Sequence, residues 1–476
     1  MAGSPPNDRA WNRHAAPSDS ESTHLSDGAN SGGSDPTAAL DIGRLLDEGP
    51  WAPMQKLVVV IAALSIIMDG FDGQLIGFAV PVLIKEWGVT RSDFAPALAA
   101  GLVGMGIGSA LAGLFADRFG RRWAVIVSVL IFGLATCCIG FAANLWHIGV
   151  LRFVAGLGIG GALPSSTTIA AEFTPARRRT LAITATIVCV PLGGMLAGLF
   201  AGVVLPHLGW RALFFLGGSL AVILGAALLF TLPETPRFLV RRPARWAELS
   251  RLVGRMSRPV ATNCAFTDIS EQRIEKSEGF PALFEKGRAR DTIALWCAFF
   301  LNLLAVYSAF TWLPTMLTSE GLDVAIASSG LTAYNFGGVI GALTCAVAIA
   351  RYGSRWPLLL CSLLGAATAF YLTTVNIALQ TGLLIAGFGL QGFFANAVQS
   401  TMYAVCAHVY PTTVRATGTA SALAFGRLGA ILSAFAGATV ITAGGKDGYL
   451  VMLGIAMTGL AFSLAVIRRH IPARAT

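Results

Sequence analysis

The chain has 476 residues, of which 55% are hydrophobic and 12% are charged, and its mean hydropathy is +0.67. A soluble protein carries about 25% charged residues, so this composition excludes an ordinary soluble domain. Many apolar runs reach the length of about 20 residues that a helix needs to cross a bilayer, which indicates a polytopic membrane protein. The net charge of +9 does not indicate nucleic acid, because the basic residues gather in connections on one side of the predicted membrane.

The first fifty residues are rich in Ser, Gly, Asp and Pro and lack the apolar core of a signal peptide. We expect residues 1–50 to form a disordered cytoplasmic tail. The last part of this tail leads directly into the first apolar run and is expected to lie at the membrane interface.

Twelve apolar runs follow, and a long, polar and basic connection separates the first six from the last six. The predicted spans are 57–84, 94–116, 123–142, 146–171, 181–205, 211–232, 292–317, 327–350, 357–375, 380–406, 413–441 and 448–467. The predicted organisation is an N-terminal six-helix half (51–235), a cytoplasmic central loop (236–291), a C-terminal six-helix half (292–467) and a cytoplasmic tail (468–476).

The distribution of basic residues predicts the orientation, because cytoplasmic connections are enriched in Lys and Arg. Of the 34 Lys and Arg, Lys85, Arg91, Arg211 and Lys446 alone lie in connections on the opposite side from the termini. Two more, Arg152 and Arg427, lie within predicted spans. Both termini are therefore expected in the cytoplasm, with the chain in the inner membrane.

The two halves contain an internal repeat. The sequence "ADRFGRRWAV" from Ala116 matches "IARYGSRWPL" from Ile349, and "EFTPARRRT" from Glu172 matches "HVYPTTVRA" from His408. Parallel repeats of this kind build transporters whose binding site lies near the bilayer midplane, between the repeats.

The motifs resemble those of the major facilitator superfamily. "GLFADRFGRR" (Gly113–Arg122) is similar to its signature between spans two and three, and "RFVAGLGIGG" and "PETPRFLV" also agree. The resemblance implies an all-α fold of 12 transmembrane helices in two six-helix parallel repeats. It implies a transporter that works by alternating access as a monomer, without a cofactor or enzymatic activity.

Within that superfamily the chain resembles the aromatic acid/proton symporters. Their mark is "DGFD" in span one (Asp69–Asp72), and "WLPTML", "YPTTVRATG" and "GRLGAIL" are similar to their later patterns. The resemblance implies proton-coupled import of a hydroxybenzoate, protocatechuate or benzoate, with the lipid bilayer as the other partner and neither nucleic acid nor metal.

Four charged residues fall at one depth of the predicted bundle. At about 1.5 Å per residue, Asp69, Asp72, Arg152 and Arg427 all lie about 18–22 Å from the inner face. Asp69 and Asp72 share a helix face and cannot comfortably both ionise, so they are predicted to couple transport to protons. The arginines can bind a carboxylate through two parallel hydrogen bonds; we favour Arg427 for substrate and Arg152 for pairing with Asp72. Fixed ion pairs that lock helices together remain the alternative.

Further candidates for substrate contacts are polar or aromatic side chains at a similar depth, since buried amides need partners and a ring needs flat apolar walls. They are Asn302, Tyr307, Trp312, Asn335 and Gln399, with Phe310, Asn396 and Tyr403 nearby. The alternative for each is helix packing.

A predicted cytoplasmic gate of ion pairs comprises Asp117, Arg118, Arg121, Arg122, Glu172, Arg179 and Arg415, which could instead be charges that only set the topology.

Three other functions stay open. A carrier of an organic cation, a sugar or an aliphatic carboxylate would keep the same fold, although Arg427 opposes a cationic cargo. A membrane-embedded sensor is disfavoured because the tail and central loop contain no recognisable signalling domain. An enzyme is disfavoured because the predicted water-facing segments contain no nucleophile–base pair, metal cluster or phosphate-binding loop.

Overall fold

A computed structural model describes residues 40–256, 265–268, 280–285, 287–377, 379–411 and 413–473. Residues Ala39–Thr476 form one compact unit. The predicted disorder of the N-terminal tail lies largely outside the described residues. The end of that tail has regular structure: β1 (Leu40–Asp41) is followed by helix α1 (Ile42–Glu48), which Asp41 caps by accepting from the backbone N–H of Gly43.

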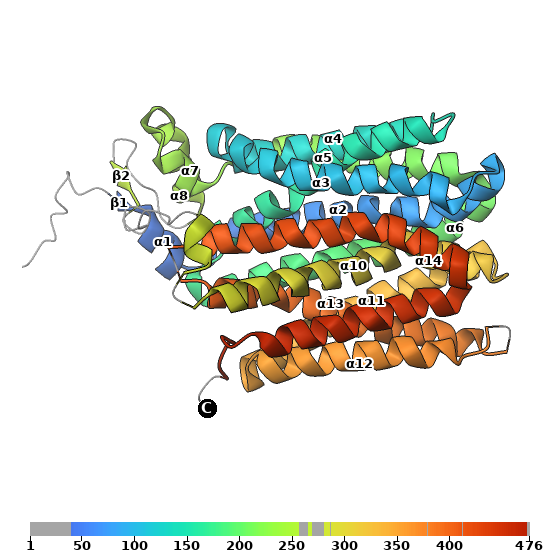
Figure 1. Ribbon diagram of the computed structural model, residues 1–476. Coiled ribbons are helices and arrows are strands. Elements are labelled where there is room, and N and C mark those ends of the chain that lie inside the picture. Colours follow the sequence, from blue (N-terminus) through green and yellow to red (C-terminus); the bar gives the residue numbers. More distant parts are fainter. Residues whose placement is uncertain are drawn as a thin grey trace, which may run out of the picture. The chain divides into compact units, whose positions relative to one another are not determined.

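Ten of the described helices are long and apolar enough to cross a membrane (Figure 1). The first five are α2 (Pro53–Trp87), α3 (Arg91–Phe119), α4 (Arg121–Ile139), α5 (Leu145–Glu172) and α6 (Ala176–Thr231). The last five are α10 (Ala289–Ser319), α11 (Val324–Tyr352), α12 (Arg355–Thr373), α13 (Thr381–Val409) and α14 (Arg415–Val466).

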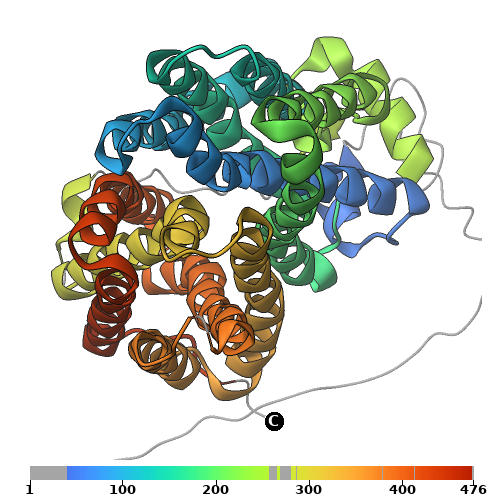
Figure 2. The same ribbon diagram turned by 90° about the vertical axis from the view of Figure 1, so that its right-hand side faces the viewer.

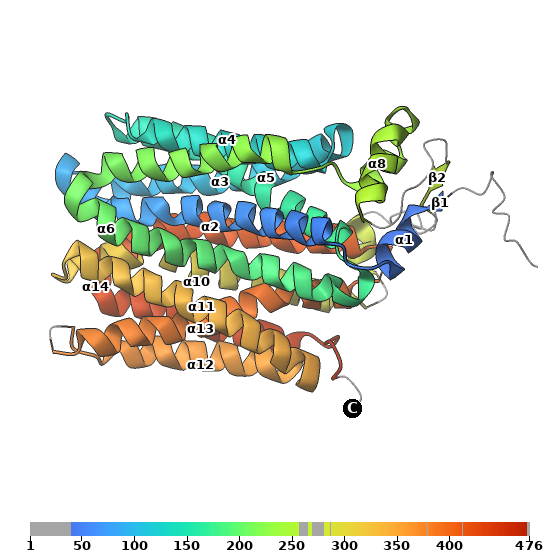
Figure 3. The ribbon, with the colours of Figure 1, turned by 180° about the vertical axis from the view of Figure 1, so that it is seen from behind.

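Two of these helices, α6 and α14, are long enough to cross twice, and each contains one residue with non-helical backbone angles. In α6 this residue is Gly209 (φ 76°, ψ 177°), and in α14 it is Gly445 (φ 55°, ψ −142°). Figures 1 and 3 show the chain folding back at these points. Only glycine adopts such angles at little cost, so each glycine permits a turn between two spans.

A glutamate accepts hydrogen bonds at each of these two turns. Beside Gly209, the Trp210 Nε1–H and the Arg211 guanidinium donate to Glu86 at 2.7 and 3.1 Å. Beside Gly445, the backbone N–H of Lys446 donates to Glu320 at 2.8 Å. Glu86 lies at the end of the first long helix of one group and Glu320 follows the first long helix of the other, so the acceptors occupy corresponding places although their donors differ.

The helices pack as two groups. In the first group α2 contacts α6, α3 contacts α5, and α4 contacts α5 and α6; in the second α10 contacts α14, α11 contacts α13, and α12 contacts α13 and α14. The view in Figure 2 shows residues 53–231 on one side and residues 289–466 on the other. Between the groups α2 meets α10, α3 meets α14 and α6 meets α11. At one such contact a Cβ on Gly77 would overlap the Phe310 carbonyl oxygen, so glycine lets these backbones touch.

The connection between the groups is more structured than the predicted central loop. It contains α7 (Pro236–Val240), the short 3₁₀ helix η1 (Pro243–Arg245), α8 (Trp246–Met256), β2 (Phe266–Thr267) and a second 3₁₀ helix η2 (Phe280–Leu283). Strand β2 pairs in parallel with β1, so the connection is joined to the segment that precedes α2. Helix α8 is amphipathic and buries Leu249, Leu252 and Val253.

Replacing Gly209 by Ala tests whether the turn in α6 depends on glycine. Nothing lies within 4 Å of a Cβ at this position, so only the backbone angles oppose the substitution, by about 1–3 kcal/mol. We expect the midpoint of thermal unfolding of the purified protein to fall by several degrees. Gly202→Ala is the matched control, because it lies in the same helix with equally open surroundings and no unusual φ. Equal midpoints for the two variants would contradict the assignment.

Candidate functional site

A cavity lies between the two helix groups, lined by residues of α2, α3, α5 and α6 on one side and α10, α11, α13 and α14 on the other. Its volume is about 90 Å³. The polar side chains that line it are Asp69, Gln74, Arg152, Tyr307, Thr311, Asn396, Gln399, Ser400, Tyr403 and Arg427. The rest of the lining is apolar. The cavity therefore combines a few charged and hydrogen-bonding groups with apolar walls, as small-molecule sites do.

The two acidic residues of α2 have different surroundings. Asp69 lines the cavity, and its Oδ1 has no hydrogen-bond partner among the described residues. Asp72 is fully buried, does not line the cavity, and lies near the Thr136 hydroxyl of α4. Three residues of helix turn the side-chain direction by about 300°, so the second carboxylate points about 60° away from the first.

The Arg152 guanidinium binds backbone rather than a carboxylate. It donates to the carbonyl oxygen of Asp72 at 3.5 Å and to that of Gly73 at 3.3 Å, and it is 4% exposed. Among the described residues no carboxylate lies within 4.0 Å of it, so Arg152 and Asp72 interact electrostatically at longer range rather than as a contact ion pair. The depth estimate brought the two residues together correctly, but the rotation of α2 directs the Asp72 carboxylate towards α4 instead.

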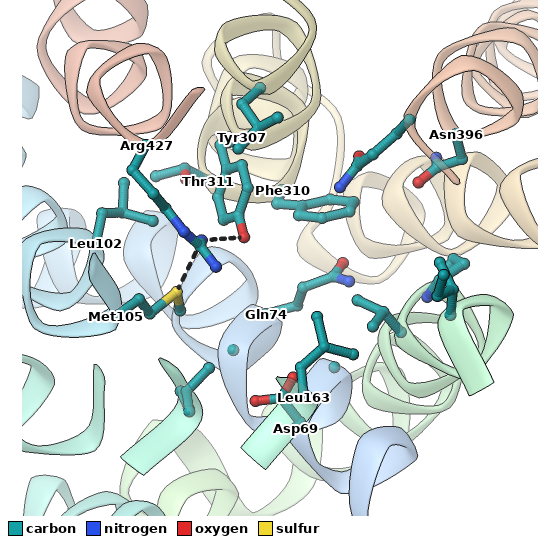
Figure 4. A pocket seen from close by; sticks show the side chains of 18 of the residues that line it. Asp69, Gln74, Leu102, Met105, Leu163, Tyr307, Phe310, Thr311, Asn396 and Arg427 are labelled. Atoms are coloured by element: carbon teal, nitrogen blue, oxygen red, sulfur yellow. Dashed lines mark hydrogen bonds between the residues drawn. The ribbon is translucent and has the colours of Figure 1, made fainter. Parts of the chain in front are cut away.

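Arg427 reaches into the cavity from α14. One guanidinium nitrogen donates to the Tyr307 hydroxyl at 2.8 Å and contacts the Met105 sulfur at 3.7 Å (Figure 4). Tyr403 also lies near the guanidinium. Within the described part of the chain no carboxylate is within 4.0 Å of Arg427. Figure 4 shows Asp69 on the opposite side of the cavity.

A reciprocal amide pair joins the two helix groups beside the cavity. Asn335 of α11 donates to the Gln74 side-chain oxygen at 2.7 Å, and Gln74 of α2 donates back at 3.3 Å. Asn335 also donates to the Leu331 carbonyl at 3.0 Å. Asn335 does not itself line the cavity, whereas Gln74 does. Gln74 was not among the predicted contact residues, although it is an amide two residues beyond Asp72 in the same apolar run and has the same need of a partner as Asn335.

The other predicted contact residues divide into two sets. Tyr307 and Gln399 line the cavity, as do Phe310, Asn396 and Tyr403. Two do not. Trp312 is fully buried and donates its indole N–H to the Ala434 carbonyl at 3.1 Å, which is a packing contact between α10 and α14. Asn302 is fully buried away from the cavity, and its amide has no partner among the described residues.

At one end of the bundle, the predicted gate residues of the first helix group come together. Asp117 pairs with Arg121 at 2.8 Å, and the backbone N–H of Arg122 donates to Glu234 at 3.1 Å. The Arg122 guanidinium donates to the Leu229 carbonyl, and the Arg118 carbonyl accepts from Arg242. Burial raises the pKa of Glu234, and the hydrogen bond from the Arg122 backbone N–H lowers it in part. Glu234, in the "PETPRFLV" motif, was not among the predicted gate residues.

A second set of contacts joins this end to the segment before α2. Arg179 of α6 pairs with Asp47 of α1, and Arg237 of α7 lies 3.9 Å from Asp47 and 3.6 Å from Asp268. Glu172 lies near Arg237 and Arg121. Asp47 was missed because the tail was expected to be disordered. Arg415 is not in this cluster: its side chain donates to the Tyr410 carbonyl in the other helix group.

Comparisons with known proteins establish the family. The model of the Major Facilitator Superfamily matches residues 62–331 and 295–476. The xylose transporter XylE from E. coli, solved in a partially occluded inward-open conformation, shares the fold with a TM-score of 0.69 at 19% identity, over 89% of this chain and 99% of that one. The chain belongs to the major facilitator superfamily and is a transporter rather than an enzyme.

Among curated relatives, the gallate transporter of Pseudomonas putida is 32% identical, over 92% of this chain and 97% of that transporter. The 4-hydroxybenzoate transporter PcaK of Pseudomonas aeruginosa is 34% identical, over 85% of this chain and 90% of that one. The gentisate transporter of Corynebacterium glutamicum is 31% identical, over 86% of this chain and 87% of that one.

The amide pair can be tested with the variants Gln74→Leu, Asn335→Leu and the double substitution. Each single change leaves a buried amide without its partner, which costs about 1–3 kcal/mol. Removing both leaves no orphaned group, so we expect the double variant to be more stable than the sum of the single losses predicts. The measurement is the unfolding free energy of the purified protein. Additive losses would show that the two amides do not act as a pair.

Proposed function

We propose that the protein imports an aromatic carboxylate together with protons, through two six-helix halves that expose the cavity alternately to each side. In this proposal α6 and α14 each cross the membrane twice, which gives twelve spans. The chain lies in the inner membrane, with both termini in the cytoplasm. The matching helix pairs and the matching turns at Glu86 and Glu320 support the two repeats. The positive charge of the connections supports the orientation.

The observation that carries the choice of cargo is the guanidinium of Arg427. It extends into a mostly apolar cavity, and the partners given for it above are a phenol and a thioether, both uncharged. A cation at this depth is costly unless an anion compensates it, and a carboxylate fits the guanidinium with two parallel hydrogen bonds. Phe310, Tyr307 and Tyr403 would face the ring of an aromatic acid. The three relatives named above are transporters of gallate, 4-hydroxybenzoate and gentisate, which supports the same class of cargo.

Proton coupling would follow from the electrostatic interaction between Asp69 and Arg427. A carboxylate that binds Arg427 cancels its positive charge, and the proton on Asp69 is then favoured. The two binding events thus assist each other, and by linkage each strengthens the other equally. Asp69 is proposed as the group that exchanges protons with the cavity. Asp72 is proposed as a second carboxylate, buried away from the cavity, that interacts electrostatically with Asp69.

In this proposal Arg152 positions helices rather than binding a carboxylate, because its guanidinium donates to backbone carbonyls. Its guanidinium is held by the carbonyls of Asp72 and Gly73, so it fixes α5 against α2 just where Asp69 enters the cavity. Its Nε is buried and has no hydrogen-bond partner within the described residues, which leaves one donor for a substrate or water.

Uptake into proteoliposomes tests the cargo. With an inward proton gradient, we expect accumulation of labelled 4-hydroxybenzoate, protocatechuate or benzoate, and none of a quaternary ammonium control. A protonophore should abolish accumulation. Uptake of the cation alone, or of the acids with undiminished accumulation in the presence of the protonophore, would contradict the proposal.

Arg427→Lys tests the substrate contact. Lys keeps the charge but cannot form the two-pronged contact, so we expect KM for the acid to rise by about tenfold or more. Arg255→Lys on α8 is the matched control, since this arginine is exposed and remote from the cavity. An unchanged KM in the Arg427 variant would remove this residue from the binding site.

Asp69→Asn tests the proton step separately from binding. The variant cannot release a proton, so it should lose gradient-driven accumulation while still exchanging labelled for unlabelled substrate across the membrane. Retained exchange also demonstrates that the variant is folded. Accumulation at the wild-type level would exclude Asp69 as the coupling group.

A further inference from the structure

An apolar groove lies on the second helix group, apart from the central cavity. It is bounded by α11, α12, α13 and α14 and has a volume of about 890 Å³. Its lining includes Tyr352, Trp356, Leu360, Leu363, Phe393 and Phe462. Trp356 is 71% exposed and Phe462 is 73% exposed, so these side chains face outwards rather than into the core. In a membrane protein this face meets lipid chains.

Four arginines lie at the end of α11, the start of α12 and just after the end of α14, which are three of the helices that bound the groove. Arg351 and Arg355 adjoin the lining residues Tyr352 and Trp356, and the Arg351 guanidinium lies 5.5 Å from the centre of the Tyr352 ring. Arg468 and Arg469 begin the C-terminal segment that follows α14. All four are exposed, and none makes an ion pair within 4.0 Å in the part of the chain that the structure describes.

The C-terminal segment is fixed next to the loop between α11 and α12. The Ser354 N–H donates to the Ile471 carbonyl, and the Ile471 N–H donates to the Ser354 hydroxyl, both at 2.9 Å. Burial lowers the pKa of His470, so this residue adds no charge at neutral pH. The acidic side chain that approaches the segment is Asp291, which accepts from the backbone N–H of Arg468 at 2.9 Å and is 4% exposed. Within the residues that the structure describes, the four guanidinium groups therefore have no ion-pairing partner.

The equivalent loop of the first helix group has carboxylates where this one has none. There Asp117 pairs with Arg121, and Glu234 accepts from the Arg122 backbone. At the offset that aligns Gly120 with Gly353, Asp117 corresponds to Ala350, and at the offset that aligns Glu172 with His408, Glu234 corresponds to His470. The second loop has thus kept two of three arginines, with Ser354 in place of Arg121, and has lost both acids, while Arg468 and Arg469 of the C-terminal segment add two arginines beside it. An external anion is the natural replacement.

We propose that this surface binds an anionic phospholipid, with one acyl chain in the groove and the phosphate on the arginines. The lining extends along α11 from Tyr352 to Thr344, which is about 12 Å of helix and close to the half-thickness of about 15 Å of the hydrocarbon core. The arginines lie at the end of the groove where the headgroup of such a lipid would sit. Each basic residue near an anionic lipid contributes a similar amount to the binding free energy. Four arginines together therefore favour an anionic over a zwitterionic headgroup.

The test measures lipid retained by the full-length protein. Purified protein is incubated in detergent with phosphatidylglycerol or phosphatidylcholine of equal chain length, and bound lipid is counted by native mass spectrometry. We expect the wild type to retain phosphatidylglycerol preferentially. The double variant Arg351→Gln/Arg355→Gln should reduce this retention by about tenfold or more. The matched control is Arg251→Gln/Arg255→Gln, two exposed arginines on α8, which should retain lipid as the wild type does.

A second measurement places the acyl chain. Phosphatidylglycerol brominated on its acyl chain should quench the fluorescence of Trp356, seen as the difference between the wild type and Trp356→Phe. Ala461→Trp, which fills the groove without touching the arginines, should lower lipid retention. Equal retention of the two lipids by the wild type, equal retention by the double variant and its control, or absence of Trp356 quenching would each overturn the proposal. The proposal would also be overturned if millimolar inorganic phosphate displaced bound phosphatidylglycerol as effectively as added lipid does, because the site would then bind a free anion.

Discussion

The account depends on one unbalanced charge: the Arg427 guanidinium, which lies among apolar walls at membrane depth with neutral partners. The hydroxyl of Tyr307 and the sulfur of Met105 orient this group without neutralising it. Asp69, its electrostatic partner, lies across the cavity rather than in contact. A contact ion pair between the two would have been a fixed clamp between the helix groups. In the proposed function, their separation leaves room for a small anion and a proton to bind together.

Hydrogen bonds from buried side chains to backbone carbonyls hold the helices around the cavity. Other side chains that line the cavity stay free to bind a substrate. Arg152 is bonded to the carbonyls of α2, and Trp312 to a carbonyl of α14, so each joins two helices. The amide pair of Gln74 and Asn335 joins the two helix groups through neutral hydrogen bonds. In the proposed alternating access, such bonds would break and reform at a lower free-energy cost than a buried ion pair. At the other end, Asp47, Arg179 and Arg237 join α1, α6 and α7.

The sequence was informative wherever a property depends on depth along a helix. Apolar length predicted the spans, and the count of residues from each end correctly put Asp69, Arg152 and Arg427 around one cavity. It was uninformative where a property depends on rotation about a helix axis. Asn302, Trp312 and Asp72 lie at suitable depths but face other helices. Nor could residue spacing predict partners between distant segments, which is why Gln74, Asp47 and Glu234 were missed as partners of Asn335, Arg179 and Arg122.

Calorimetric titration of the purified protein with 4-hydroxybenzoate tests the central claim most directly. Repeating it in buffers of different ionisation enthalpy gives the number of protons taken up for each acid bound. If Arg427 and Asp69 are coupled through the cavity, binding should take up close to one proton at a pH where Asp69 is ionised in the empty protein, and the uptake should vanish in Asp69→Asn. A binding heat that is the same in every buffer across pH about 5 to 9 would contradict the account.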